Sequence, residues 1–193
     1  VFPSGHLSYA FNVNNTLQIS YAKRVRRPVY DDLSPFMTVS DSRNFFSGNP
    51  NLNTAYTDAF EIGHLYNTQK STLSSSIYYR ITYHVISSIR TVNSAGFATT
   101  LPQNLNSEKD FGIEFAHNYT PIKWWKIDNN FNLFNANIDG SNIDAQYVTN
   151  TTTWLVRHTS RFILKNGFDL QFRGNYKNKK KIAQGSQKAI AFC

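Results

Sequence analysis

Residues 73–85 read Leu-Ser-Ser-Ser-Ile-Tyr-Tyr-Arg-Ile-Thr-Tyr-His-Val, and two kinds of side chain alternate along this stretch. The odd positions from Leu73 to Val85 are apolar or aromatic except for one serine, whereas the even positions carry serine, tyrosine, arginine, threonine and histidine. Side chains two positions apart lie on the same face of a β-strand. The stretch therefore predicts a long strand with one apolar face and one mostly polar face.

The same alternation recurs along the chain, most clearly from Phe111 to Tyr119 and from Phe168 to Tyr176. Helical periodicity is weak throughout, so the pattern favours strands. It predicts about nine of them, at residues 5–12, 16–27, 56–67, 71–91, 98–119, 123–139, 146–164, 168–178 and 187–193.

The connections between these strands alternate in length. Short turns are expected at 13–15, 67–70, 120–122 and 165–167, and longer loops at 28–55, 140–145 and 179–186. The turn at 93–96, followed by an irregular stretch from Pro102 to Asn106, fills the remaining connection. Short turns at one end and long loops at the other are typical of outer-membrane barrels. The predicted fold is all-β. Residues 1–193 are expected to form an antiparallel meander that is part of a larger transmembrane β-barrel.

The composition supports a membrane barrel over an ordinary soluble core. Aromatic residues make up 15% of the chain and charged residues only 17%. The longest apolar run, Ala189 to Cys193, is far below the roughly 18 residues of a spanning helix, so a membrane would be crossed by strands. A soluble β-sandwich also alternates and is the rival fold, but the strands show no leucine-rich second layer. Aromatic residues beside the short turns are expected to form an interfacial girdle: Tyr66, Tyr119, Trp124, Trp125 and Phe168.

Several short motifs go beyond this pattern. They are Ser20-Tyr21-Ala22-Lys23-Arg24-Val25-Arg26-Arg27-Pro28, Asp32-Leu33-Ser34-Pro35-Phe36, Gly48-Asn49-Pro50-Asn51-Leu52 and Phe60-Glu61-Ile62-Gly63. Together they resemble the outer-membrane β-barrel family found at the C-terminal end of TonB-dependent receptors, especially those of Bacteroidetes. Later pieces such as Phe111-Gly112-Ile113-Glu114 and Trp124-Trp125 fit as well, although Ser34 stands where the family pattern leads us to expect asparagine.

The resemblance implies a receptor in the outer membrane of a Gram-negative bacterium that takes up a scarce nutrient, such as an iron chelate, a vitamin, a glycan or a peptide. It also implies contact with TonB through an N-terminal plug domain. The chain starts at Val1 without such a domain and stops at Cys193, where the resemblance implies further strands and an aromatic last residue. We therefore expect a fragment of a longer protein.

Charged residues on the polar faces are the candidates for a wet lumen wall. They are Glu61, Arg80, His84, Glu114, Arg157, Arg161, Arg173 and Lys177. Two basic clusters should lie at the outer rim, because their strands run away from the short turns; they comprise Lys23, Arg24, Arg26 and Arg27, and Lys179, Lys180 and Lys181. Lipopolysaccharide phosphates lie at that level, so the net charge of +8 is assigned to lipopolysaccharide and not to nucleic acid.

Nothing in the sequence points to catalysis. The five histidines have no metal-ligand spacing, and no nucleophile-elbow or phosphate-loop motif occurs, so neither a metal site nor a cofactor is expected. A barrel that serves as an adhesin or scaffold is the main functional alternative. A soluble sandwich that binds a polyanion is the second, and the sequence does not identify the small ligand of a receptor.

Overall fold

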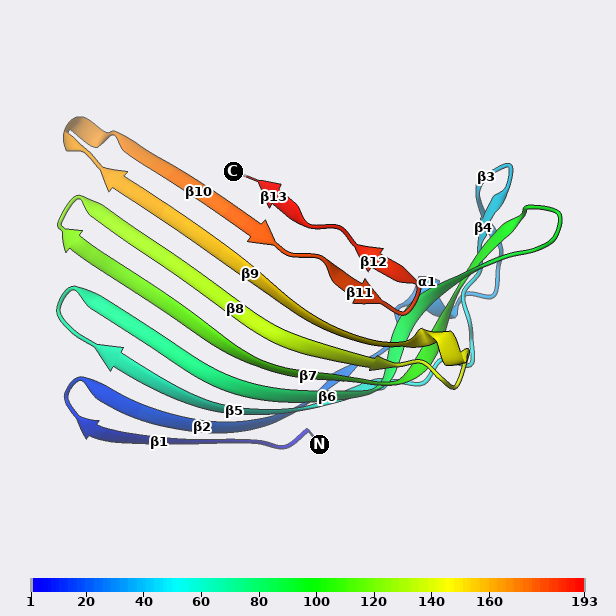
Figure 1. Ribbon diagram of the computed structural model, residues 1–193, viewed down its shortest axis with the longest axis horizontal. Coiled ribbons are helices and arrows are strands. Elements are labelled where there is room, and N and C mark those ends of the chain that lie inside the picture. Colours follow the sequence, from blue (N-terminus) through cyan, green and yellow to red (C-terminus); the bar gives the residue numbers. More distant parts are fainter. Residues whose placement is uncertain (1, 193) are drawn as a thin grey trace.

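The computed structural model describes residues 2–192 and consists mainly of one curved antiparallel sheet (Figure 1). Neighbouring strands follow the order β1-β2-β5-β6-β7-β8-β9-β10-β13, and the sheet is open. Their bounds are β1 (Ser4–Asn12), β2 (Asn15–Arg26), β5 (Ala55–Asn67), β6 (Ser71–Val92), β7 (Ala98–Ile122), β8 (Trp125–Asp139), β9 (Val148–Ile163), β10 (Asp169–Lys177) and β13 (Ile190–Phe192). The second sheet is a two-stranded hairpin of residues 180–187, which is too small to form the other layer of a sandwich, so the rival β-sandwich is wrong for the described residues.

The nine strands of the meander match the expected ones closely, with two differences. The range 187–193 contains the end of β12 (Gly185–Gln187) and the short strand β13. The stretch from Pro102 to Asn106, expected to be irregular, continues β7 instead. Along this stretch β7 pairs only with β6, where Pro102 lies opposite Ser88. The other edge of β7 has no partner strand there, so it accommodates a proline, which has no N–H to donate.

Short turns gather at one end of the sheet and long connections at the other, as Figure 1 shows. The turns β1–β2, β5–β6, β7–β8 and β9–β10 lie at the short end. The longer connections hold the remaining elements, which sequence alternation did not resolve: α1 (Tyr30–Leu33), β3 (Thr38–Asp41), β4 (Asn44–Phe46), β11 (Lys180–Ile182) and β12. No helix within residues 2–192 has the length and apolarity needed to cross a membrane.

Strand register sorts the side chains of the sheet onto two faces. Ile62, Ile77 and Ile113 occupy directly opposed positions on β5, β6 and β7, so they share the apolar face. Ile62 is 55% exposed and Ile77 is 54% exposed, although both lie in the middle of the sheet. So large an uncovered apolar wall is unfavourable in water but matches the hydrocarbon of a membrane.

The motif Gly48-Asn49-Pro50-Asn51-Leu52 ties the long β2–β5 connection to the sheet. A Cβ on Gly48 would lie 2.4 Å from the carbonyl oxygen of Ser34, so only glycine allows this approach of two backbone segments. The side chain of Asn49 donates a hydrogen bond to the Pro102 carbonyl at 3.2 Å, and the Asn53 N–H donates to Asn104 Oδ1 at 2.7 Å. The motif thus anchors a loop at the long-loop end to β7.

The alternation of faces inverts at His84. Its φ of +53° lies in the left-handed region, which no other non-glycine in the described part of the chain adopts. Before His84 the odd residues of β6 lie on the apolar face, whereas Ile89 packs in a small core with Leu105, Ile138 and Ala183 on the opposite face. Asn104 Nδ2 donates to the His84 carbonyl at 2.8 Å and holds the inverted backbone.

The inversion predicts opposite effects of glycine at neighbouring positions. His84→Gly is expected to raise the free energy of unfolding of the full-length protein by about 1 kcal/mol, because glycine has no penalty at positive φ. Thr82→Gly, in regular strand, should lower it by a similar amount. Urea unfolding from lipid vesicles, followed by tryptophan fluorescence, measures both, and equal destabilisation by the two variants would contradict the assignment.

Candidate functional site: the polar face and its docked hairpin

The polar face of the sheet carries the charged residues expected to line a lumen. Register places Glu61 opposite Tyr78, and Arg80 opposite Asp110, on the same face. Glu114, Arg157, Arg161 and Arg173 share this face through the pairings of β7 to β10. His84 lies at the inversion point and is exposed. Contact of these residues with a transported ligand stays a prediction.

At the centre of this face lies Tyr78, which forms a hydrogen bond and a cation–π contact and which sequence reasoning did not single out. The Tyr78 hydroxyl donates to Asn132 Oδ1 on β8 at 2.9 Å, across the intervening strand β7. The Tyr78 ring can cross β7 because the β7 residue below it is Gly112, which has no side chain. A Cβ at this position would lie 2.6 Å from the Tyr78 hydroxyl and 2.6 Å from Cβ of Phe134. Arg80 covers the Tyr78 ring, with its guanidinium carbon 4.1 Å from the ring centroid.

A hairpin formed by β11 and β12 folds back onto this face from the long-loop end (Figure 1). Lys180 Nζ lies 2.8 Å from Glu108 Oε1 on β7 and 5.6 Å from the ring centroid of Phe134. The side chains of the ion pair are only 18% and 22% exposed, so the pair is screened less than one at the surface. Ala183 completes the anchor by packing in the core with Ile89.

Gln184 gives the hairpin a second anchor. Its Oε1 accepts from the Arg90 N–H at 2.7 Å, and its Nε2 donates to the Arg90 carbonyl at 2.9 Å and to the Tyr147 hydroxyl at 2.6 Å. These bonds occupy both polar groups of one amide. Three contacts therefore hold the hairpin over the polar face: the Lys180–Glu108 ion pair, the packing of Ala183 in the small core, and the hydrogen bonds of the Gln184 amide.

The basic residues expected at the outer rim do not gather on one surface. Lys23 lies on the apolar face, where its Nζ is 3.5 Å from Asp58 Oδ1. Arg24 and Arg26 take polar-face register positions, and Lys180 turns inward to Glu108. Arg27, Lys179 and Lys181 are exposed. Contact of any of these residues with lipopolysaccharide stays a prediction.

The aromatic residues expected at the membrane interface lie within or beside the short turns. Trp124 is half exposed in the β7–β8 turn, and Phe168 precedes β10. Trp125 Nε1 donates to Ser160 Oγ at 2.7 Å, and its ring stacks on Phe162 with centroids 5.7 Å apart. Tyr66 and Tyr119 lie near the same end of β5 and β7. Their membrane depth remains a prediction.

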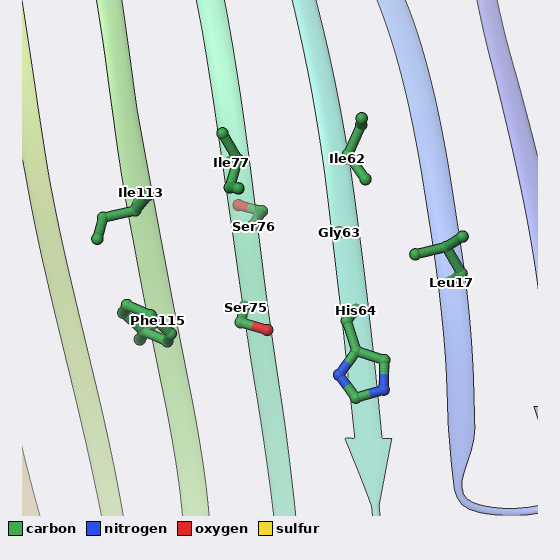
Figure 2. Close-up of a pocket in the computed structure, with 9 residues that line it drawn as sticks. All are labelled: Leu17, Ile62, Gly63, His64, Ser75, Ser76, Ile77, Ile113 and Phe115. Carbon is green, nitrogen blue, oxygen red and sulfur yellow. The ribbon is translucent and has the colours of Figure 1, made fainter.

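A hollow of about 300 Å³ lies on the apolar face, across β2, β5, β6 and β7. Figure 2 shows its lining: Leu17, Ile62, Gly63, His64, Ser75, Ser76, Ile77, Ile113 and Phe115. The side chain of Ser75, opposite His64, is too small to fill the hollow. At its edge, His64 Nε2 lies 3.0 Å from Asn15 Oδ1. This surface suits lipid acyl chains better than a water-borne ligand, since most of its side chains are apolar.

Within the described residues, no group of three or more His, Cys, Asp or Glu side chains is arranged to hold a metal ion. The polar face instead offers amides, hydroxyls and a few charges. Such a surface can hydrate a passage or bind polar groups of a ligand.

Comparison with known proteins supports the same architecture. The model of the outer membrane protein beta-barrel family matches residues 1–193. The fold is similar to the ferric enterobactin receptor mutant R480A (PfeA) of Pseudomonas aeruginosa in complex with enterobactin, with a TM-score of 0.65 and 14% identity over 98% of this chain and 31% of that chain. The FrpB iron transporter from Neisseria meningitidis matches with a TM-score of 0.60 and 14% identity over 98% of this chain and 30% of that one.

The copper transporter OprC gives a TM-score of 0.64 and 14% identity, over 96% of this chain and 29% of its own. The chain thus spans less than a third of the length of these three structures. At such identity the similarity concerns the fold alone. No curated protein matches the chain.

The close contact between Tyr78 and Gly112 predicts a steric cost for any side chain at that position. Gly112→Ala is expected to lower the free energy of unfolding of the full-length protein by about 1–3 kcal/mol, because Tyr78 and Phe134 must move. Gly174→Ala is the matched control, since a Cβ there meets no atom within 4 Å. Urea unfolding measures both; equal effects would contradict the packing argument.

The ion pair of the hairpin predicts its local stability. Lys180→Met is expected to weaken docking by roughly 1–3 kcal/mol, since Glu108 keeps a half-buried charge without its partner. Lys179→Met removes an exposed lysine from the same connection and is the control. Hydrogen exchange of residues 180–187 should accelerate in the first variant only. Unchanged exchange in Lys180→Met would show that the pair does not hold the hairpin.

Proposed function

This chain belongs to the outer membrane protein beta-barrel family, and we propose that it forms wall strands of a TonB-dependent receptor that takes up a scarce nutrient. The protein is located in the outer membrane of a Gram-negative bacterium. The observation that carries the proposal is the division of one sheet into an apolar wall and a polar wall, with a loop hairpin docked on the polar side.

A membrane wall of this kind works only when its edges are paired. The main sheet is open, with β1 and β13 at its edges, and unpaired backbone groups are costly in hydrocarbon. In our proposal further strands of the same barrel pair with both edges. Residues 1–193 are then one sector of a wider, plugged barrel, and TonB energises it through the plug.

The transported molecule belongs to a broad class in this proposal: an iron chelate, a vitamin, a glycan or a peptide. The similar structures carry different cargo in their names, namely enterobactin, iron and copper. Loops and lumen residues determine which ligand binds, and a shared fold does not transfer a substrate. The similar proteins are receptors and transporters, which supports a transport role over catalysis.

Deletion of the complete gene tests the proposal. We expect a growth defect when one nutrient is scarce, restored by the intact gene and absent when that nutrient is abundant. The restored growth should require TonB, because passage through a plugged barrel needs energy from the inner membrane. The growth yield on a panel of limiting iron chelates, vitamins, glycans and peptides is the measurement.

The control for this experiment is a strain that carries the gene with Lys179→Met, which should grow like the wild type. A deletion strain that grows normally on every limiting nutrient but no longer attaches to polymer surfaces would contradict transport. That result would favour the adhesin or scaffold barrel instead.

A further inference from the structure

The hollow on the apolar face lies among strands that are paired on both sides. Its lining comes from β2, β5, β6 and β7, and each of these strands has both of its neighbours in the sheet. Figure 2 shows the small Ser75 of β6 between the rings of His64 and Phe115. Further strands of a closed barrel would join at β1 and β13, so they would leave this hollow open toward the lipid.

The hollow becomes polar toward the short turns. There His64 Nε2 lies 3.0 Å from Asn15 Oδ1, and His117 Nε2 lies 2.9 Å from Ser71 Oγ. The His117 ring stacks on Tyr119, with the ring centroids 5.8 Å apart. Polar side chains are costly within hydrocarbon. This polar rim therefore marks the level at which the hydrocarbon ends.

Two tyrosines of the rim offer hydroxyl groups to a ligand. Tyr66 is 39% exposed and Tyr119 is 38% exposed. Register places Tyr66 opposite Leu73, and Tyr119 opposite Ser71, so both lie on the same face as the hollow and beside β6. A phenol hydroxyl can donate to a phosphate or ester oxygen.

The two turns beside this rim are basic. Lys70 immediately precedes β6, Lys123 lies in the β7–β8 turn, and both are exposed. The Thr120 N–H donates to the Lys70 carbonyl at 2.8 Å, which holds the ends of the two hairpins side by side. Residues 64–75 and 115–127, which contain both turns, include three lysines and no aspartate or glutamate. The rim therefore attracts a negatively charged group.

The distance from the rim to the hollow matches half of a bilayer. Ser71 and Ile77 are six residues apart on β6. That separation is about 20 Å of strand, or roughly 15 Å along the membrane normal at the usual tilt of barrel strands. The hydrocarbon core is about 30 Å thick. The hollow thus lies in the half of the membrane nearer to the short turns, which in outer-membrane barrels face the periplasm.

We propose that the hollow and its polar rim bind one phospholipid of the periplasmic leaflet. One acyl chain lies in the hollow over Ser75 and Ile77. The phosphate lies at the rim, where Tyr66, Tyr119 and Lys70 can reach it. This inference goes beyond the proposed function, because it concerns the outer wall of the barrel and holds whichever nutrient is transported.

Photo-crosslinking of the full-length protein in detergent micelles tests the site. The probe is a trace of phosphatidylethanolamine that carries a diazirine on one acyl chain, and mass spectrometry of peptides locates the adducts. We expect the adducts to concentrate in residues 62–64, 75–77 and 113–115, which line the hollow. Unlabelled phosphatidylethanolamine should displace the probe. Diacylglycerol, which has no phosphate, should displace it at least about tenfold more weakly.

A variant that fills the hollow tests the acyl-chain contact. Ser75→Trp should reduce the adducts in the hollow at least about fivefold, because the indole occupies the space of the chain. Val156→Trp is the matched control, since Val156 lies in the same register row as Ser75 but on β9, outside the hollow. It should keep the adducts within about twofold of the wild-type level. Circular dichroism confirms that both variants keep their strand content.

A second variant tests the head-group contact without filling the hollow. Lys70→Gln/Lys123→Gln should weaken the affinity for unlabelled phosphatidylethanolamine at least about fivefold, since it removes two positive charges beside the phosphate. Lys179→Gln/Lys181→Gln removes the same charge from the long-loop end and should leave the affinity unchanged.

Adducts spread evenly over the apolar face, or equal displacement by diacylglycerol, would overturn the inference. Wild-type adducts in folded Ser75→Trp protein would do the same. A hollow that takes up no lipid at all would be left to a protein partner, which also overturns it. Nutrient uptake is scored separately by growth, so a failure of the lipid site and a failure of the transport proposal are distinguishable.

Discussion

The pairing of backbone hydrogen bonds across neighbouring strands is the constraint on which the rest of this structure depends. In hydrocarbon an unpaired N–H or C=O group costs several kcal/mol, so the chain must run as long, fully paired strands. Strand pairing in turn forces side chains to alternate between two faces. Once Ile77 lies toward lipid, Tyr78 has to lie on the other side, where its hydroxyl donates to Asn132.

The same constraint explains where irregularity is tolerated. Three irregular features lie toward the long-loop end, beyond the stretch where β7 pairs with both β6 and β8: the inverted backbone at His84, the proline in β7 and the anchored β2–β5 loop. There Asn49 and Asn104 side chains replace ladder hydrogen bonds with bonds to backbone carbonyls. In the middle of the sheet such substitutes are not needed, because neighbouring strands supply the partners.

Sequence periodicity predicted the strands well because alternation is a local signal, repeated over many residues. It could not predict contacts between residues far apart in the chain. Lys180 was expected at the rim with its sequence neighbours, yet it pairs with Glu108, 72 positions away. The glycine under Tyr78 was equally hidden, since Gly112 looks like any strand glycine until β6 and β8 are placed on either side of it.

The charged residues of the polar wall show most clearly what the sequence pattern could not predict. Arg157, Arg161 and Arg173 are equivalent in the sequence pattern, each a charged residue on a polar face. Pairing of β9 with β10 separates them, because Asp169 lies near enough to neutralise only Arg161. The strand register therefore decides which charges of the polar wall are paired within the sheet, and the number of charges in the sequence does not.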